Sequence, residues 1–185
     1  MSLEHALLVS LAEQPGSGYE LARRFDRSIG YFWQATHQQI YKVLGRMETA
    51  GWLDVRTLGR GRQDKKVYAV NPAGHDEILR WMGQPGDLEI LRSTLAVKIR
   101  AAAFTDSPEL PGEIARHRAM HAERLAVYLD MERRDFAAPE TLDRRGRVHH
   151  VLLRGGILAE RFFLDWLDEV VQALQLPTTT SGVNL

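Results

Sequence analysis

Apolar positions recur at helical spacing through the first fifty residues and then change to alternation. Runs between Leu3 and Ala50 repeat every three to four residues, which predicts three helices. From Trp52 to Leu58 and from Lys65 to Val70 apolar and polar residues alternate, which predicts two strands joined by a glycine-containing turn. Asn71-Pro72 then supplies a cap and a first-turn proline for a fourth helix. The predicted order is three helices, a β-hairpin and a helix.

Two capping boxes define where the second and third helices begin. Ser17 is followed three residues later by Glu20, and Thr36 is followed three residues later by Gln39. At this spacing, each pair satisfies two of the unpaired backbone N–H groups at a helix start. Gly51 stands where a glycine commonly ends a helix, so the third helix is expected to stop there.

The second half of the chain is expected to be entirely helical. The pattern predicts one helix from Asp87 to Phe104, a long helix from Glu113 to about Arg134, and a last long helix from Val148 to Leu174. The fold is therefore predicted as mainly α. Its expected domains are a winged helix–turn–helix in residues 1–82, a helical dimerisation and effector domain of about three helices in 83–176, and a flexible tail in 177–185.

The last predicted helix is apolar on more than one face. Such a helix must be covered by more than one neighbour, and three helices in a small domain offer few. A partner chain is the expected source of the missing cover, giving a two-fold homodimer. The alternative is that the first domain of the same chain covers this face. The residues expected at the dimer interface are Leu88, Leu91, Leu95, Val151, Leu152, Ile157, Leu164 and Val171.

Composition removes several classes of protein. The 185 residues include no cysteine, which excludes disulfides, thiolate metal sites and thiol nucleophiles. No apolar run is long enough for a transmembrane helix, and the N-terminus has no basic-then-apolar order typical of a secretion signal. We therefore expect a cytoplasmic protein with no membrane partner. The net charge is zero, yet residues 36–66 carry seven basic and three acidic side chains, a local net charge of +4.

This local positive charge coincides with residues suited to DNA. The side of the third helix opposite its apolar stripe carries Gln38, Lys42 and Gly45, flanked by Tyr41 and Arg46. Glutamine, lysine, arginine and tyrosine bind base edges and phosphates. Three helices followed by a basic hairpin predict a winged helix–turn–helix. In this fold the third helix enters the major groove, and the wing contacts the backbone or the minor groove.

The sequence resembles the PadR family of bacterial transcriptional regulators. No single motif is specific, but the ordered set with its spacings is. The resemblance is dense over residues 3–82, whereas residues 88–176 match only in helical layout. The motifs that carry it are Gly18-Tyr19-Glu20-Leu21, Phe32-Trp33-Gln34-Ala35-Thr36-His37-Gln38-Gln39-Ile40-Tyr41, Arg46-Met47-Glu48, Gly51-Trp52-Leu53, Lys65-Lys66-Val67-Tyr68 and Ala73-Gly74.

The resemblance implies a homodimeric regulator, usually a repressor released by a small molecule, whose partner is a two-fold symmetric operator in double-stranded DNA. It also places Tyr19 and Arg46 on phosphates. The residues assigned to DNA are Tyr19, Thr36, His37, Gln38, Gln39, Tyr41, Lys42, Arg46, Arg60, Arg62, Lys65 and Lys66.

Three of these positions on the third helix need comment. Lys42 stands where many members of the family have proline, and Gly45 where a basic residue is frequent. The glycine puts one phosphate contact in doubt, which Lys42 would replace. Gln39 has two alternative roles, because a side chain that closes the capping box is not free to read a base.

Two other functions stay open at this point. A winged helix can bind protein alone and act as an adaptor. His117 and His121 lie one helical turn apart, with Glu113 one turn earlier, so a metal-dependent enzyme or sensor is a remote alternative. No phosphate-binding GxxxxGK[ST] loop or GxSxG elbow is present, and we expect no catalytic activity, cofactor or metal. A small aromatic or hydrophobic effector is expected, with candidate contacts at Trp33, His149, Phe162 and Trp166.

Overall fold

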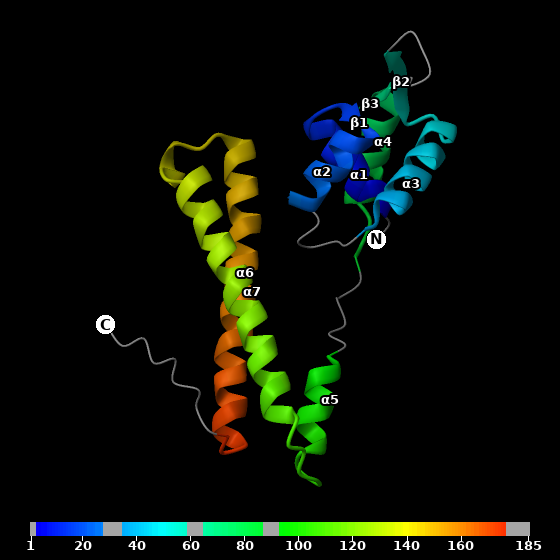
Figure 1. The fold of residues 1–185 in the computed structure, drawn as a ribbon. Helices are drawn as coiled ribbons and strands as arrows, with labels where there is room; N and C mark the ends of the chain where they lie inside the picture. The colour runs from blue at the N-terminus through cyan, green and yellow to red at the C-terminus, as the bar shows by residue number, and fades with distance from the viewer. Residues whose placement is uncertain (1–2, 28–34, 59–64, 87–92, 177–185) are drawn as a thin grey trace. The chain divides into compact units, whose positions relative to one another are not determined.

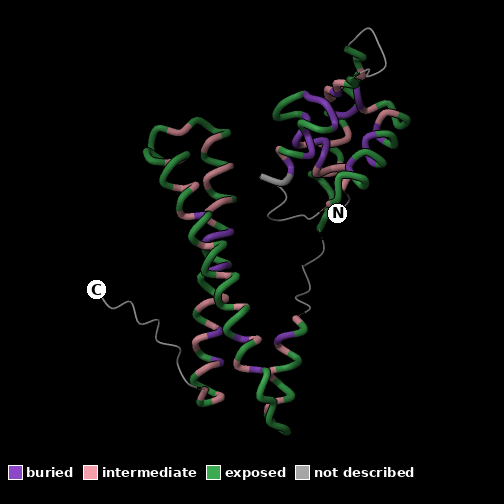
Figure 2. The backbone as a smooth tube through the Cα atoms, in the orientation of Figure 1, coloured by how far each residue is buried: buried purple, intermediate pink, exposed green. Residues whose placement is uncertain are grey.

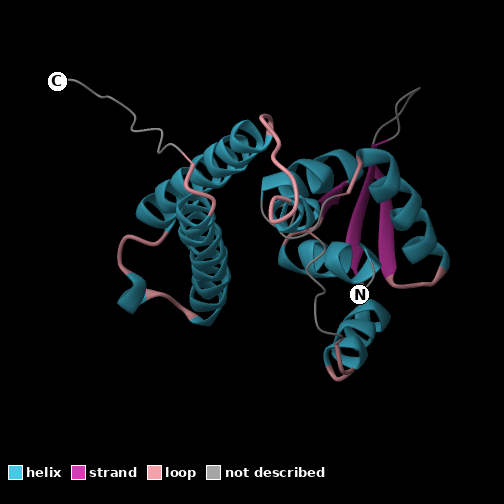
Figure 3. Ribbon diagram, turned by 90° about the horizontal axis from the view of Figure 1, so that it is seen from below, coloured by secondary structure: helices cyan, strands magenta, loops and turns pink. Residues whose placement is uncertain are grey.

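The computed structural model describes residues 3–27, 35–58, 65–86 and 93–176, and the chain divides into two compact units, Met1–Glu89 and Ile90–Leu185. Both units are mainly helical, and the described strands form one small sheet (Figures 1 and 3). The predicted mainly α fold, with a winged helix–turn–helix first, is confirmed. No helix in the described ranges is both long and apolar enough to cross a membrane.

The described part of the first unit contains four helices and three short strands. Its elements in chain order are α1 (Leu3–Glu13), β1 (Gly16–Ser17), α2 (Gly18–Arg27), α3 (His37–Thr49), β2 (Leu53–Leu58), β3 (Lys65–Val70) and α4 (Pro72–Met82). The strands form an antiparallel sheet in the order β1-β3-β2, and Leu53 pairs with Val70 while Leu58 pairs with Lys65. The hairpin matches the alternating pattern of the sequence. β1 was not anticipated, because two residues are too few to show a period.

Helix α1 lies at the centre of this unit. It packs against α2, α3, α4 and β3, and residues from all three helices of the helix–turn–helix region join one core (Figure 2). Each fully buried leucine or phenylalanine contributes about 1.5–3 kcal/mol relative to exposure, so this core fixes how α2 and α3 are held. Its buried members are Leu7, Leu8, Leu11, Leu21, Ala22, Phe25, Ile40, Val43, Leu44, Met47, Leu53 and Tyr68.

The second unit is a pair of long helices with a short one beside them. Its elements are α5 (Thr94–Ala101), α6 (Leu110–Asp135), the 3-10 turn η2 (Pro139–Thr141) and α7 (Arg144–Ala173). α6 and α7 lie side by side, and α5 packs against α6 (Figure 1). A small core joins all three helices and consists of Leu95, Leu110, Ile114, Leu167 and Val170.

The predicted bounds of these helices were wrong at their ends. α5 begins at Thr94 and not at Asp87, because the Ser93 hydroxyl accepts a hydrogen bond from the Ala96 backbone N–H at 3.1 Å and caps the helix. It ends at Ala101, three residues before Phe104. The sequence pattern located the apolar stripe and missed the cap.

The two long helices are each longer than predicted. α6 begins at Leu110 and includes Pro111 in its first turn, where the missing N–H of proline has no helical partner to lose. α7 begins at Arg144 because Asp143 accepts a hydrogen bond from Gly146 N at 2.7 Å. The prolines and glycines of these two segments hide the helix starts in the sequence pattern.

Candidate nucleic-acid interface

The start of α3 is held by a complete capping box. The Thr36 hydroxyl accepts from the Gln39 backbone N–H at 3.2 Å, and the Gln39 side-chain oxygen accepts from the Thr36 backbone N–H at 2.8 Å. The predicted box is confirmed. It removes Gln39 from our set of base-reading residues, because its amide oxygen is already bonded to the backbone of Thr36.

One side of α3 is buried and the other is exposed. Ile40, Val43, Leu44 and Met47 are buried in the core of the first unit. The opposite side is free of acidic residues over its first two and a half turns and consists of the exposed residues His37, Gln38, Tyr41, Lys42, Gly45 and Arg46. The structure therefore presents to solvent the face that the sequence assigned to DNA.

Two of the predicted basic residues beside this face, Lys65 and Lys66, are already paired with carboxylates. Lys65 Nζ lies 2.9 Å from Glu20 Oε1, and Lys66 Nζ lies 3.1 Å from both carboxylate oxygens of Glu48. The Lys65 hydrogen bond, with the backbone and hydroxyl of Ser17, lowers the pKa of Glu20 to about 2. The bond to Glu48 raises the pKa of Lys66. Glu20 is therefore charged at neutral pH, and its pair with Lys65 is ionic.

Arg46 and Lys42 of α3 differ in whether they pair with a carboxylate. Arg46 Nη2 lies 2.6 Å from Glu4 Oε1, although its side chain is more than half exposed. Lys42 makes no ion pair with the described part of the chain. On the exposed face of α3 it is therefore the cation most available to a phosphate, which agrees with the role expected from its position.

A hollow opens between α2, α3 and β3 next to these lysines. It is lined by Ser17, Gly18, Tyr19, Tyr41, Lys65, Lys66 and Tyr68. Gly18 lines the hollow next to the Tyr41 ring, and a Cβ at this position would collide with that ring. The exposed phenol of Tyr19 stands at the edge of the hollow, with the Arg23 guanidinium 5.9 Å from its ring centre.

Sequence reasoning missed three residues of this surface. Arg23 stacks on Tyr19 from one helical turn away, and the spacing of four residues is the signal that could have found it. Glu20 was recognised as a capping residue, but its pairing with Lys65 and that of Glu48 with Lys66 join residues 45 and 18 positions apart. Such pairings leave no periodic trace in the sequence. Several predicted residues lie outside the described residues, namely Arg60 and Arg62 of the wing, the effector candidate Trp33, and Leu88 and Leu91.

The apolar residues expected at a dimer interface fall into two groups. Leu95 and Ile157 are buried within the single chain, so they need no partner to cover them. Val151 and Leu152 are 64% and 53% exposed, and Leu164 and Val171 are half-buried. Exposed Val148, Leu158 and Phe162 extend the same helix surface. α6 therefore covers one side of α7 and leaves another uncovered within this unit.

Of the two histidines considered for a metal site, His121 bridges two helices and His117 does not. His121 Nδ1 of α6 lies 2.5 Å from Glu160 Oε2 of α7, and its ring stacks on Phe163 at 4.6 Å. Glu160 is buried and also accepts from Arg124 at 3.2 Å. His117 lies 3.6 Å from Glu113 on its own helix. Among the described residues no three histidine or acidic side chains are grouped to hold a metal, and this geometry gives His121 a structural role between α6 and α7.

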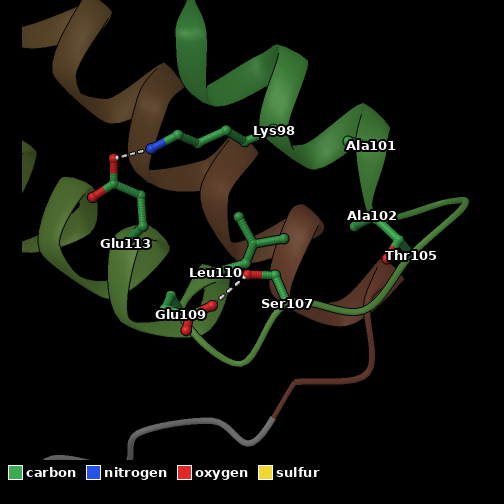
Figure 4. Close-up of a pocket in the computed structure, with 8 residues that line it drawn as sticks. All are labelled: Lys98, Ala101, Ala102, Thr105, Ser107, Glu109, Leu110 and Glu113. Carbon is green, nitrogen blue, oxygen red and sulfur yellow. Dashed lines mark hydrogen bonds and ion pairs between the residues drawn. The ribbon is translucent and has the colours of Figure 1, made fainter.

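The three predicted effector residues within the described ranges, His149, Phe162 and Trp166, lie in different surroundings. Phe162 is exposed and meets Phe163 edge-on at 5.5 Å, whereas Trp166 packs against the core of the second unit and His149 is half-buried. A separate hollow of about 250 Å³ lies between α5 and the start of α6 (Figure 4). The charged residues that line this hollow bond to other residues of its lining. Lys98 donates to Glu113 at 3.0 Å, and Ser107 donates to Glu109 at 2.9 Å.

Comparison with known proteins connects these features to a family. The model of the transcriptional regulator PadR-like family matches residues 7–80, and the model described as virulence activator alpha C-term matches residues 91–175. The probable transcriptional regulator Rv1176c of Mycobacterium tuberculosis is 48% identical over 186 residues, which cover 95% of this chain and 98% of that protein.

Solved structures share the whole fold. The virulence activator AphA of Vibrio cholerae superposes with a TM-score of 0.80 at 29% identity, covering 94% of this chain and 98% of AphA. PadR of Bacillus subtilis in complex with operator DNA superposes with a TM-score of 0.81 at 22% identity, covering 92% of this chain and 97% of PadR. The similarity thus extends through both units, and the chain belongs to the PadR-like family of transcriptional regulators.

Proposed function

We propose that this regulator binds double-stranded DNA as a homodimer, with α3 of each protomer in the major groove. The observation that carries the proposal is the exposed, acid-free face of α3, which begins at a capping box and lies beside two lysines of β3. Family membership supports a DNA-binding regulator over a protein adaptor or a metal-dependent enzyme.

The residues on and beside this face divide by role into base contacts, phosphate contacts and the wing. Gln38 reads a base edge, because a glutamine amide both donates and accepts and so pairs with adenine. Tyr41 and His37 contact bases or phosphates at the groove edge, while Tyr19, Thr36, Lys42 and Arg46 contact phosphates. Lys65 and Lys66, together with Arg60 and Arg62, form the basic wing.

The dimer is proposed to form through the uncovered face of α7. Val151 and Leu152 lie on this face with a row of further exposed apolar residues, and a second copy of the chain would remove them from water. Two-fold symmetry would present two copies of α3 to a symmetric operator. Leu95 and Ile157 are not included, because their own chain already covers them.

We further propose that the protein is a repressor and that a small aromatic or hydrophobic effector releases it. The exposed Phe162 beside Phe163 has the chemistry to stack on such a molecule, and it stands at the C-terminal end of the apolar row that the dimer would cover, so the effector would bind at the border of that interface. An effector acts only through its difference in affinity between two states. It must therefore bind the DNA-free dimer more tightly than the DNA-bound dimer.

The direct test is fluorescence anisotropy with duplex from immediately upstream of the protein's own gene and with a scrambled duplex, across a salt series. A dimer that contacts about 6–10 phosphates gives a slope of log affinity against log salt of roughly −5 to −9. Preference for the upstream duplex with such a slope is the expected result. Lack of binding to any duplex at low salt would refute the proposal and favour the adaptor.

A further inference from the structure

The two lysines that flank α3 are bonded to carboxylates before any DNA arrives. Glu20 of α2 holds Lys65, and Glu48 of α3 holds Lys66, at Nζ-to-oxygen distances of 2.9 and 3.1 Å. All four side chains are between about a third and a half exposed, so neither pair compensates for the burial of a charged group. Exposed ion pairs contribute little to folding stability, commonly less than about 1 kcal/mol. Glu20 also completes the capping box with Ser17, which accounts for its place at the start of α2 but not for its pairing with Lys65.

We propose that Glu20 and Glu48 are specificity-determining residues, which weaken contacts of Lys65 and Lys66 with phosphates that arrive out of register. This inference rests on the proposed DNA-binding function. It concerns two acidic residues that make no attractive contact with DNA themselves.

The physical basis is competition between two kinds of anion for the same ammonium group. A phosphate that approaches Lys66 meets the negative charge of Glu48 within hydrogen-bond distance of the same nitrogen. A lysine ammonium has three donors, so it can bridge a carboxylate and a phosphate when the phosphate is correctly placed. When the phosphate is displaced, it cannot share the ammonium group, which stays bonded to the carboxylate, so the phosphate gains little attraction from the lysine.

Correct and incorrect DNA differ in this placement. On a preferred site, base contacts by α3 fix the register, and the phosphates reach the bridging position. Non-specific binding consists almost entirely of phosphate contacts in shifting registers. The carboxylates therefore penalise random DNA more than the preferred site. The neighbouring hollow, which Lys65 and Lys66 both line, provides the space in which the bridging phosphate would sit.

Glu48→Gln tests the proposal because it removes the charge and retains the shape of the side chain. One surface charge at about 4 Å is worth roughly a fivefold change in affinity. We therefore expect Glu48→Gln to bind scrambled duplex about fivefold more tightly, with a salt slope steeper by about 1 per protomer, and to bind the preferred duplex within about twofold of wild type. Glu20→Gln should act alike, since an amide oxygen still accepts from Ser17.

Two controls separate this effect from others. Glu123→Gln removes an exposed carboxylate from α6 and should leave both affinities unchanged. In a Lys66→Gln background, Glu48→Gln should lose most of its effect on scrambled duplex, since the ammonium group for which the carboxylate and the phosphate compete is gone. Unchanged binding of scrambled duplex by Glu48→Gln, or equal gains on both duplexes, would overturn the inference and leave the proposed function intact. Failure of wild type and all variants to bind any duplex would overturn both.

Discussion

Gly18 at the start of α2 lies directly beneath the ring of Tyr41 on α3. A Cβ on Gly18 would lie 3.1 Å from both Cδ1 and Cζ of that ring and closer still to Cε1. The contact joins the two helices of the helix–turn–helix at the point where the proposed DNA surface begins. The observed position of the Tyr41 ring therefore requires a residue without a side chain at position 18.

Gly18→Ala should destabilise the protein and weaken DNA binding together. The added methyl displaces the Tyr41 ring, which is 50% exposed and can turn into solvent, so the expected cost is that of an off-rotamer side chain, about 0.5–1.5 kcal/mol. Urea unfolding and duplex titration measure the two effects. Gly45→Ala is the matched control, because nothing lies within 4 Å of its Cβ and alanine is favoured inside a helix by about 0.5–1 kcal/mol. Equal stability of the two variants would contradict the contact.

Gly156→Ala should destabilise the second unit at the α6–α7 contact. Its Cβ would lie 2.9 Å from Cε2 of the buried Tyr128, and the expected loss is about 1–3 kcal/mol. Gly155→Ala, one residue earlier, meets nothing within 4 Å and should be neutral or stabilising. Thermal unfolding of both variants checks the prediction, which fails if Gly155→Ala is the more damaging change.

Gln38→Ala should reduce discrimination between DNA sequences more than it reduces overall affinity. A bidentate contact of this kind accounts for about 1–3 kcal/mol of preference for the correct base. Lys42→Ala should instead weaken all duplexes alike and make the salt slope shallower by about 1 per protomer. Anisotropy with preferred and scrambled duplex distinguishes the two behaviours. Equal losses on both duplexes for Gln38→Ala would exclude it from base reading.

Leu152→Glu should dissociate the proposed dimer. It places a charge within an exposed apolar row of α7, where a partner chain would have to desolvate it. Sedimentation velocity should show a dimer for wild type and a monomer for the variant. Leu79→Glu, at an exposed leucine of α4 in the first unit, is the control and should remain dimeric. A wild-type monomer would refute the dimer proposal itself.

Acid should remove the stabilising effect of Glu77. Hydrogen bonds from Arg80 and His5 lower its pKa to about 2, from an ordinary value of 4.5. A carboxyl group with a lowered native pKa stabilises the fold above its ordinary pKa, and this is lost as pH falls towards the native value. Glu77→Gln should therefore melt below wild type at neutral pH, and the difference should shrink between pH 4.5 and about 2. A difference that grows on acidification would contradict this pairing.

Much of the first unit was predictable because its signals are local. The capping boxes at Ser17 and Thr36 and the Asn71-Pro72 start each involve residues within one turn, so the sequence shows them directly. The helix ends of the second unit were predicted less accurately, because the capping residues Ser93 and Asp143 lie among residues that are also typical of loops. Strand β1 depends on pairing with β3, more than fifty residues away, and has no pattern of its own.

The sequence alone determined the order of the helices and of the β2–β3 hairpin, the apolar face of α3 and hence the polar face that remains exposed, since these follow from periodicity. Only the tertiary structure decided which charges meet. It brought Glu20 to Lys65 and Glu48 to Lys66, buried Glu160 between His121 and Arg124, and covered Leu95 and Ile157 within one chain. Such contacts depend on how helices and strands pack over long sequence separations, and periodicity within one element carries no information about them.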